Sequence, residues 1–278
     1  MIRSNGILSA PARVFLALAA LVAACVMPRI GVAAPAGRLA DFGIVFLHGK
    51  GAWPGAFNGG ILSALRDEGA LTATPEMPWS FHRRYGATYD EAMTEIAAAV
   101  ATLKNKGARR IVVIGHSLGA NAAIGYAARR PNELAGVVAL SPGHLPEVGD
   151  MRAFVAGAVA RAKTLVAEGK GDVTQTFPDM AQGIPLIAHA TPRVYLSWFD
   201  PDGPAVIPKN AAAIGAAPHP VPLLWVVGKL DPIDRRGPDY AFAAAAKNPK
   251  SKYIEVFAGH LTAPMAARGQ VVAWINSL

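Results

Sequence analysis

The stretch Ile111-Val112-Val113-Ile114-Gly115-His116-Ser117-Leu118-Gly119-Ala120 decides the fold. Its first four residues are β-branched and apolar, which predicts a buried strand, and the segment after Ser117 has the spacing of a helix. The pattern G-x-S-x-G is common by chance, but between a strand and a helix it forms the sharp turn of a nucleophile elbow. We therefore expect Ser117 to be a nucleophile. The alternative is a serine that only caps an ordinary helix.

Strand patterns and helix patterns alternate on both sides of this stretch. The expected strands cover residues 43–47, 71–76, 110–115, 134–140, 221–227 and 253–257. The expected helices cover residues 56–67, 89–106, 118–130 and 239–247, and a final helix runs to Leu278. This alternation predicts an α/β fold, a mostly parallel sheet of about six strands with helices on both faces.

Residues 144–217 interrupt the alternation. They contain a helix-like segment, 151–168, followed by proline-rich sequence in which no strand pattern is clear. Long irregular insertions in a compact domain are usually functional or disordered. The aromatic residues of this insertion argue against disorder: Phe154, Phe177, Tyr195, Trp198 and Phe199. We expect an inserted, mobile helical lid over the site, with its aromatic side chains facing the substrate.

Two further residues fit the chemistry of a serine nucleophile, which needs a base near neutral pH. His260 follows the expected strand at 253–257, and Asp231 follows the one at 221–227. Carboxyl ends of parallel strands meet at one edge of the sheet, so these side chains should meet there. Asp234 and Glu147 are the alternatives to Asp231 as the acid that orients the histidine.

With these motifs in place, the chain from about residue 41 to the end resembles the α/β-hydrolase-fold serine hydrolases. The motifs that carry the resemblance are His48-Gly49, the elbow at Ser117, Gly228-x-x-Asp231-Pro232 and Gly259-His260. Little room precedes the strand at 43–47 for a first antiparallel hairpin, so a sheet with a reduced N-terminal part is expected. The resemblance implies an oxyanion hole made by the backbone amides of Leu118 and Lys50, with Gly51 as second choice for the latter.

Candidate substrate contacts lie in the loops beyond the strand ends. They are Gly51, Trp53, Arg83, Arg84, His144, Trp198 and Phe199. Arg83 or Arg84 would hold an anionic group of the substrate by a forked hydrogen bond; the alternative is a solvated basic loop. His144 ends a strand on the side of the site. Trp198 and Phe199 would form an apolar or aromatic pocket.

The first 36 residues have the pattern of an export signal. A positively charged start is followed by the apolar run 14–24 and by small residues up to Ala36. The run is too short for a membrane-spanning helix, which needs about 20 apolar residues. The alternative is a lipoprotein signal of residues 1–24, with lipidated Cys25 as the only membrane attachment. We therefore expect residues 37–278 to form one exported domain, periplasmic or secreted.

Composition limits the remaining function classes. Cleavage after Ala36 removes three arginines and no acidic residue, which lowers the net charge from +8 to +5. The basic residues are scattered, so no nucleic-acid partner is expected. Cys25 is the only cysteine and no pair of histidines has metal-ligand spacing, so neither a metal nor a cofactor is expected.

The sequence therefore predicts hydrolysis of a small-molecule ester or thioester with an apolar or aromatic part. Ser117, His260 and Asp231 would act through a covalent acyl-enzyme. Amide and carbon–carbon bond hydrolysis use the same residues and stay open. The alternative from another class is a non-catalytic exported protein that binds a small molecule on the same fold.

Overall fold

A computed structural model describes residues 37–233 and 236–278. The predicted export signal, residues 1–36 with Cys25, lies outside the described residues, and so does Asp234. Within the described ranges, no helix combines the length and the apolar character that crossing a bilayer requires.

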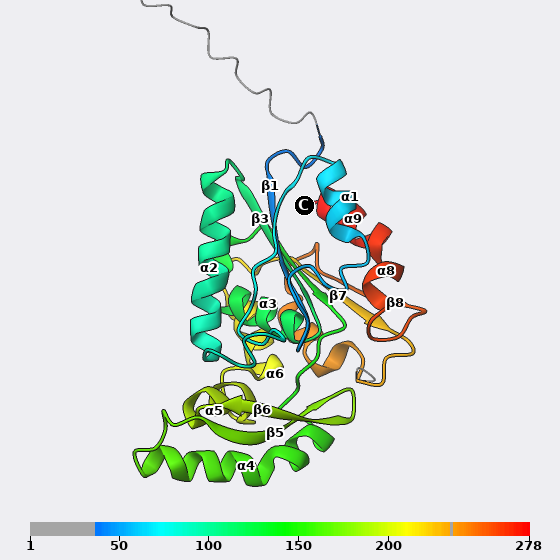
Figure 1. The fold of residues 1–278 in the computed structure, drawn as a ribbon. Helices are drawn as coiled ribbons and strands as arrows, with labels where there is room; N and C mark the ends of the chain where they lie inside the picture. The colour runs from blue at the N-terminus through cyan, green and yellow to red at the C-terminus, as the bar shows by residue number, and fades with distance from the viewer. Residues whose placement is uncertain (1–36, 234–235) are drawn as a thin grey trace, which may run out of the picture. The chain divides into compact units, whose positions relative to one another are not determined.

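Six strands form one parallel sheet in the order β2-β1-β3-β4-β7-β8 (Figure 1). They are β1 (Phe42–Leu47), β2 (Leu71–Ala73), β3 (Arg110–His116), β4 (Gly136–Leu140), β7 (Leu223–Gly228) and β8 (Lys252–Val256). The predicted six-stranded, parallel α/β architecture is confirmed. All six carboxyl ends point to one edge, because every neighbouring pair is parallel.

Helices cover both faces of the sheet. One face carries α2 (Tyr89–Asn105), α3 (Leu118–Arg129), α6 (Ile207–Ala216) and the short α7 (Phe242–Ala245), and the other carries α1 (Ile61–Asp67), α8 (Ala263–Ala266) and α9 (Arg268–Asn276). Successive residues of β3 serve opposite faces: Val113 packs with the first set and Val112 with the second. Burial on both faces explains why the central strands read as continuous apolar runs.

Local backbone chemistry sets where the helices begin. Thr88 and Glu91 exchange side-chain and backbone hydrogen bonds in a capping box at the start of α2. Helix α1 begins five residues later than predicted, because Gly59 and Gly60 have φ values of 61° and 79°, which no α-helix contains. The helix predicted at 239–247 is divided into a short 3-10 turn, Pro238–Tyr240, and α7.

The predicted insertion lies between β4 and β7, which are neighbours in the sheet. It consists of α4 (Gly149–Ala167), an antiparallel hairpin of β5 (Gln175–Ala181) and β6 (Ile184–Ala190), α5 (Pro192–Phe199) and α6. The expectation of a helical insertion without strands is wrong. Each strand contains a proline, which a two-stranded hairpin tolerates because each strand has an open edge. Mobility of this insertion stays a prediction.

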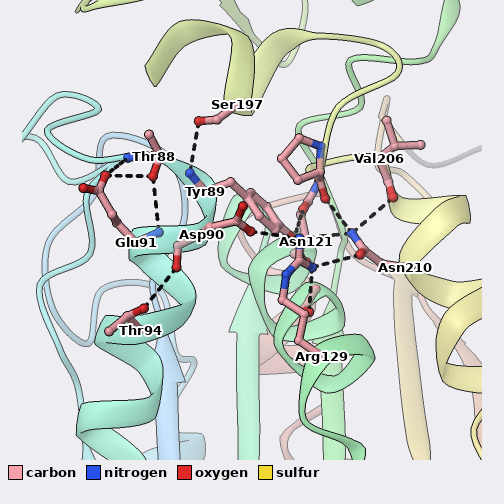
Figure 2. A network of polar contacts seen from close by, with 12 residues as sticks. Thr88, Tyr89, Asp90, Glu91, Thr94, Asn121, Arg129, Ser197, Val206 and Asn210 are labelled. Carbon is pink, nitrogen blue, oxygen red and sulfur yellow. Dashed lines mark hydrogen bonds and ion pairs between the residues drawn. The ribbon is translucent and has the colours of Figure 1, made fainter. Parts of the chain in front are cut away.

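A polar network attaches the insertion to helices α2 and α3 (Figure 2). Asn121 of α3 donates to the carbonyls of His144 and Ala205, at 2.9 and 2.7 Å. The Tyr89 hydroxyl of α2 donates to the Asn121 side-chain oxygen at 3.1 Å, and the Tyr89 amide donates to the hydroxyl of Ser197 on α5 at 3.0 Å. The helix that begins after Ser117 is thus fixed to the insertion at two places, at His144 before α4 and at Ala205 between α5 and α6.

Candidate active site

Ser117 lies in a sharp turn between β3 and α3. Its φ of 57° is in the left-handed region, a strained backbone conformation for a residue with a side chain. The turn is compact because Gly115 and Gly119 have no Cβ: one built at Gly115 would lie 2.0 Å from the carbonyl oxygen of Gly119, and one at Gly119 would lie 2.2 Å from that of Leu47. The glycines of the motif are therefore required by close backbone approach.

His260 and Asp231 meet Ser117 at the carboxyl edge of the sheet. The Nε2 of His260 lies 2.9 Å from Oγ of Ser117, and its Nδ1 lies 2.7 Å from Oδ2 of Asp231. Both His260 and Asp231 are buried. With a proton on Nδ1 donated to the carboxylate, Nε2 is free to accept the serine proton.

Asp231 carries a charge in this setting. Burial raises its pKa, but hydrogen bonds from His260 and from the Ile233 amide outweigh burial, so the pKa lies below its usual range. Glu147, the alternative acid, has a pKa raised by burial, and its carboxylate accepts a hydrogen bond from the Tyr240 hydroxyl. Of the two carboxylates, it is Asp231 that is hydrogen-bonded to the imidazole ring of His260.

His116 and Gly143 also shape the site, although neither was among the predicted site residues. The Nε2 of His116 donates to the backbone carbonyl of His260 at 3.0 Å, and burial lowers the pKa of His116 to about 4, so this ring is neutral. A Cβ built at Gly143 would lie 2.9 Å from Oγ of Ser117. The position directly before the serine was the only sequence signal for His116, and Gly143 had none.

The loop after β1 contains both of the amides considered for the oxyanion hole, those of Lys50 and Gly51. The amide of Gly51 donates to the carbonyl of Trp79 at 2.9 Å, so it is not available to a ligand. In the part of the chain that the structure describes, the amides of Lys50 and Leu118 have no hydrogen-bond acceptor. His48 holds the turn, because its Nε2 accepts from the Met77 amide at 3.1 Å.

A cavity of about 330 Å³ opens above Ser117. Its lining is mostly apolar and comes from segments that are distant in sequence. They are the start of α4 with Leu145, Val148 and Met151, the hairpin turn at residues 180–183, and three loops with Phe57, Ile233 and Leu261. Asp150 and Arg236 also line it. Of the predicted substrate contacts, His144 lines the cavity, and so does Lys50, which was predicted as an oxyanion-hole donor.

The prediction that Trp198 and Phe199 form the substrate pocket is wrong. Both side chains are fully buried and neither lines the cavity. The Nε1 of Trp198 donates to the carbonyl of Ala87 at 2.9 Å, and its ring meets that of Trp79 edge to face. Phe199 stacks on Tyr195 at 4.2 Å. These aromatic residues hold the insertion on the core instead.

The prediction that Arg83 or Arg84 binds the substrate is also wrong. The guanidinium of Arg83 makes a forked hydrogen bond to Glu95, at 2.6 and 2.7 Å, so its donors are engaged within the protein. Arg84 is exposed, with its guanidinium 5.7 Å from the centroid of the Phe81 ring. Neither arginine lines the cavity.

Gly51 and Trp53 are likewise outside the cavity lining. Trp53 is 57% exposed, and its ring centroid lies 6.1 Å from that of Phe57. Phe57, which the sequence did not single out, contributes the aromatic ring that does reach the cavity. Within residues 37–233 and 236–278, no group of His, Cys, Asp or Glu has the arrangement of a metal site.

Comparison with known proteins identifies a family whose model matches this chain. Residues 44–274 match the model of the Alpha/beta hydrolase family. No curated protein matches the chain. Among solved structures, a monoacylglycerol lipase from Paleococcus ferrophilus superposes with a TM-score of 0.59 at 21% identity, covering 84% of this chain and 94% of the lipase.

Two further solved structures share the fold at lower identity. A highly thermostable carboxyl esterase from Bacillus coagulans has a TM-score of 0.59 at 14% identity, over 84% of this chain and 88% of the esterase. The thioesterase domain from the curacin biosynthetic pathway has a TM-score of 0.56 at 12% identity, over 85% of this chain and 91% of the domain.

Proposed function

Because the chain belongs to the alpha/beta hydrolase family, we propose that it is a serine hydrolase that cleaves carboxylic esters or thioesters. One observation carries the proposal: the hydrogen-bonded series Ser117, His260 and Asp231 opens onto a mostly apolar cavity. A binding protein on this fold would need the cavity but not a serine aligned with a histidine and a buried carboxylate.

The geometry supports a two-step reaction. Oγ of Ser117 attacks the carbonyl carbon while Nε2 of His260 takes the serine proton. The amides of Lys50 and Leu118 stabilise the negative charge on the carbonyl oxygen. His260 then protonates the departing alcohol or thiol. Water attacks the acyl-enzyme with His260 again as base, and the acid leaves.

The cavity indicates what kind of acyl group the enzyme accepts. A volume of about 330 Å³ with walls of Leu, Met, Val and Ile side chains favours a medium-sized apolar acyl chain over a bare acetyl group. The lipase, esterase and thioesterase among the structural neighbours use carbonyl substrates of these two types by their descriptions. Esters and thioesters of graded chain length are therefore the substrates to test first.

A fluorophosphonate probe tests the proposal directly, because it labels only a serine that an adjacent base activates. We expect the full-length protein to be labelled and to hydrolyse p-nitrophenyl esters. Ser117→Ala should abolish both while leaving the melting temperature near that of the parent. Activity of Ser117→Ala within tenfold of the parent would place the nucleophile elsewhere.

A further inference from the structure

Lys50 connects the loop after β1, which carries the proposed oxyanion-hole amide, to the insertion. Its backbone belongs to the loop after β1, but its side chain is only 9% exposed and runs to the β5–β6 hairpin. There the Lys50 ammonium forms an ion pair with Asp179 of β5 and donates to the carbonyl of Met180 at 2.8 Å. The two partners are 129 residues apart in the sequence.

The Asp179 carboxylate is buried and surrounded by hydrogen-bond donors. Its side chain is 3% exposed and accepts three donors, Lys50, the Tyr85 hydroxyl at 3.1 Å and the Met180 amide at 2.6 Å. Burial lowers the pKa of Lys50, and the charge of Asp179 opposes that change. A buried ion pair usually stabilises a fold no better than apolar side chains of similar volume. Its presence beside a catalytic loop therefore calls for a functional reason.

The backbone hydrogen bonds on either side of Lys50 leave its amide free. On one side of Lys50, the carbonyl of His48 accepts from Nε1 of Trp79 at 2.8 Å; on the other, the Gly51 amide donates to the Trp79 carbonyl. Lys50 itself makes no backbone hydrogen bond through its amide among the described residues. The peptide unit that carries this amide is held locally through the Gly49 carbonyl, which accepts from the Ala52 amide at 3.2 Å and from Nδ1 of His48 at 2.9 Å. The Lys50 side chain adds a second restraint, which comes from the hairpin.

We propose that Asp179 is a positioning residue that holds the Lys50 amide in the geometry of the oxyanion hole. This inference rests on the proposed function. An oxyanion donor must lie about 2.7–3.1 Å from the developing charge, so a small rotation of the Lys50 peptide weakens catalysis. Asp179 itself does not line the cavity, whereas the residues that follow it, 180–183, form one of its walls. The same hairpin thus shapes the acyl pocket and aligns the donor opposite it.

Three variants of the pair separate alignment from stability: Asp179→Asn, Lys50→Met and the double variant. Each single variant leaves a buried charge without its partner, so we expect both to lower the melting temperature. The double variant removes both charges and should recover most of that loss. The kcat should fall by roughly tenfold to a hundredfold in all three, short of the loss of a whole oxyanion donor. KM should change by less than about threefold, because the cavity wall remains.

Tyr195→Phe is the matched control. The Tyr195 hydroxyl donates to the Pro178 carbonyl at 2.8 Å, so this change removes a contact of the same hairpin without touching Lys50. It should lower the melting temperature slightly and leave kcat within about twofold, because it removes one ordinary hydrogen bond. An alkylboronic acid, whose adduct with serine is tetrahedral and anionic, provides a second readout: its affinity should fall in proportion to kcat for the pair variants and stay unchanged for Tyr195→Phe.

The double variant distinguishes a positioning role of Asp179 from a role in stability alone. Melting temperature restored with kcat and boronate affinity still low supports the positioning role, whereas kcat restored together with melting temperature overturns it. Equal kcat losses in Tyr195→Phe and Asp179→Asn would overturn it as well. Failure of the proposed function is visible separately, since a parent protein that neither reacts with fluorophosphonate nor hydrolyses esters would show it before any variant is made.

Discussion

Both carboxylate oxygens of Asp231 are engaged, one by the ring of His260 and the other by the Ile233 amide. The first bond fixes the tautomer of the histidine, because a carboxylate only accepts and so requires the proton on Nδ1. An amide side chain at this position could donate its N–H to Nδ1 and thereby place the proton on Nε2. The base would then carry its proton where it should accept one.

We therefore expect Asp231→Asn to lower kcat by as much as roughly ten-thousandfold, the loss that the same change causes in serine proteases. Steady-state hydrolysis of a p-nitrophenyl ester measures it. Glu147→Gln and Asp234→Asn are the controls and should retain activity within about tenfold, since Glu147 bonds to Tyr240. If Asp234→Asn proves more damaging than Asp231→Asn, the acid has been misplaced.

At the scale of the element, α5 fastens the insertion to the core through Trp198. The ring lies at 4.9 Å from that of Tyr89 and 5.4 Å from that of Trp79, and it is fully buried. Trp198→Ala should therefore lower the free energy of unfolding by about 3–5 kcal/mol, as expected for a large buried aromatic side chain. Esters of all chain lengths should lose activity alike. Chemical denaturation measures the loss of stability, and a series of esters of graded chain length measures the activity. A change of chain-length preference without destabilisation would indicate that Trp198 contacts the substrate.

Helix α4 instead lines the cavity through its first turn. Met151 lines the cavity and is nearly buried, whereas Phe154, on the same helix, is 39% exposed and does not line it. Met151→Trp adds volume inside the cavity, so kcat/KM for an octanoyl ester should fall by roughly tenfold or more relative to an acetyl ester. Phe154→Trp should leave the ratio of the two unchanged. Equal ratios in both variants would show that the acyl chain binds elsewhere.

These elements differ in how well the sequence predicts them. The elbow and the positions of Asp231 and His260 were predictable, because each depends on a strand pattern and the residues directly after it. The hairpin was hidden, because Pro178 and Pro185 interrupt the alternation that marks a strand. The cavity lining was hidden for another reason: α4, the hairpin turn and the loop at Ile233 meet only in the folded protein, and none carries a local signal for that meeting.

For the whole molecule, three buried histidines connect stability to pH. Burial lowers the pKa of His48, of His144 and of His116, the last to about 4. The unfolded chain takes up protons on these rings below about pH 6.5, while the folded protein does not, so stability present above pH 6.5 is lost as the pH falls toward 4. At about 1.4 kcal/mol per pH unit, the loss from His116 alone is on the order of 3 kcal/mol. Asp231, whose pKa is also lowered, adds to the loss only below about pH 4.

Urea denaturation at pH 7, 5.5 and 4.5 measures this dependence. We expect the parent protein to lose stability at each step, and His116→Gln to lose less, because glutamine has no proton to take up in the unfolded chain. The amide of glutamine is able to donate to the His260 carbonyl as the imidazole does. The difference between the two proteins therefore reports protonation of the His116 ring and not loss of this hydrogen bond. Identical slopes for both proteins would show that His116 is not buried in its neutral form.

The order of the reacting groups along the chain governs when a newly made molecule becomes active. Ser117 precedes His260 by 143 residues, and the two meet only when β7 and β8 have joined the edge of the sheet. At a synthesis rate of about 5–20 residues per second, roughly 7–30 s separate the appearance of the nucleophile from that of its base. During that interval the ribosome carries a serine without a general base. A nascent chain, or one truncated before β8, therefore lacks the imidazole that the proposed reaction requires.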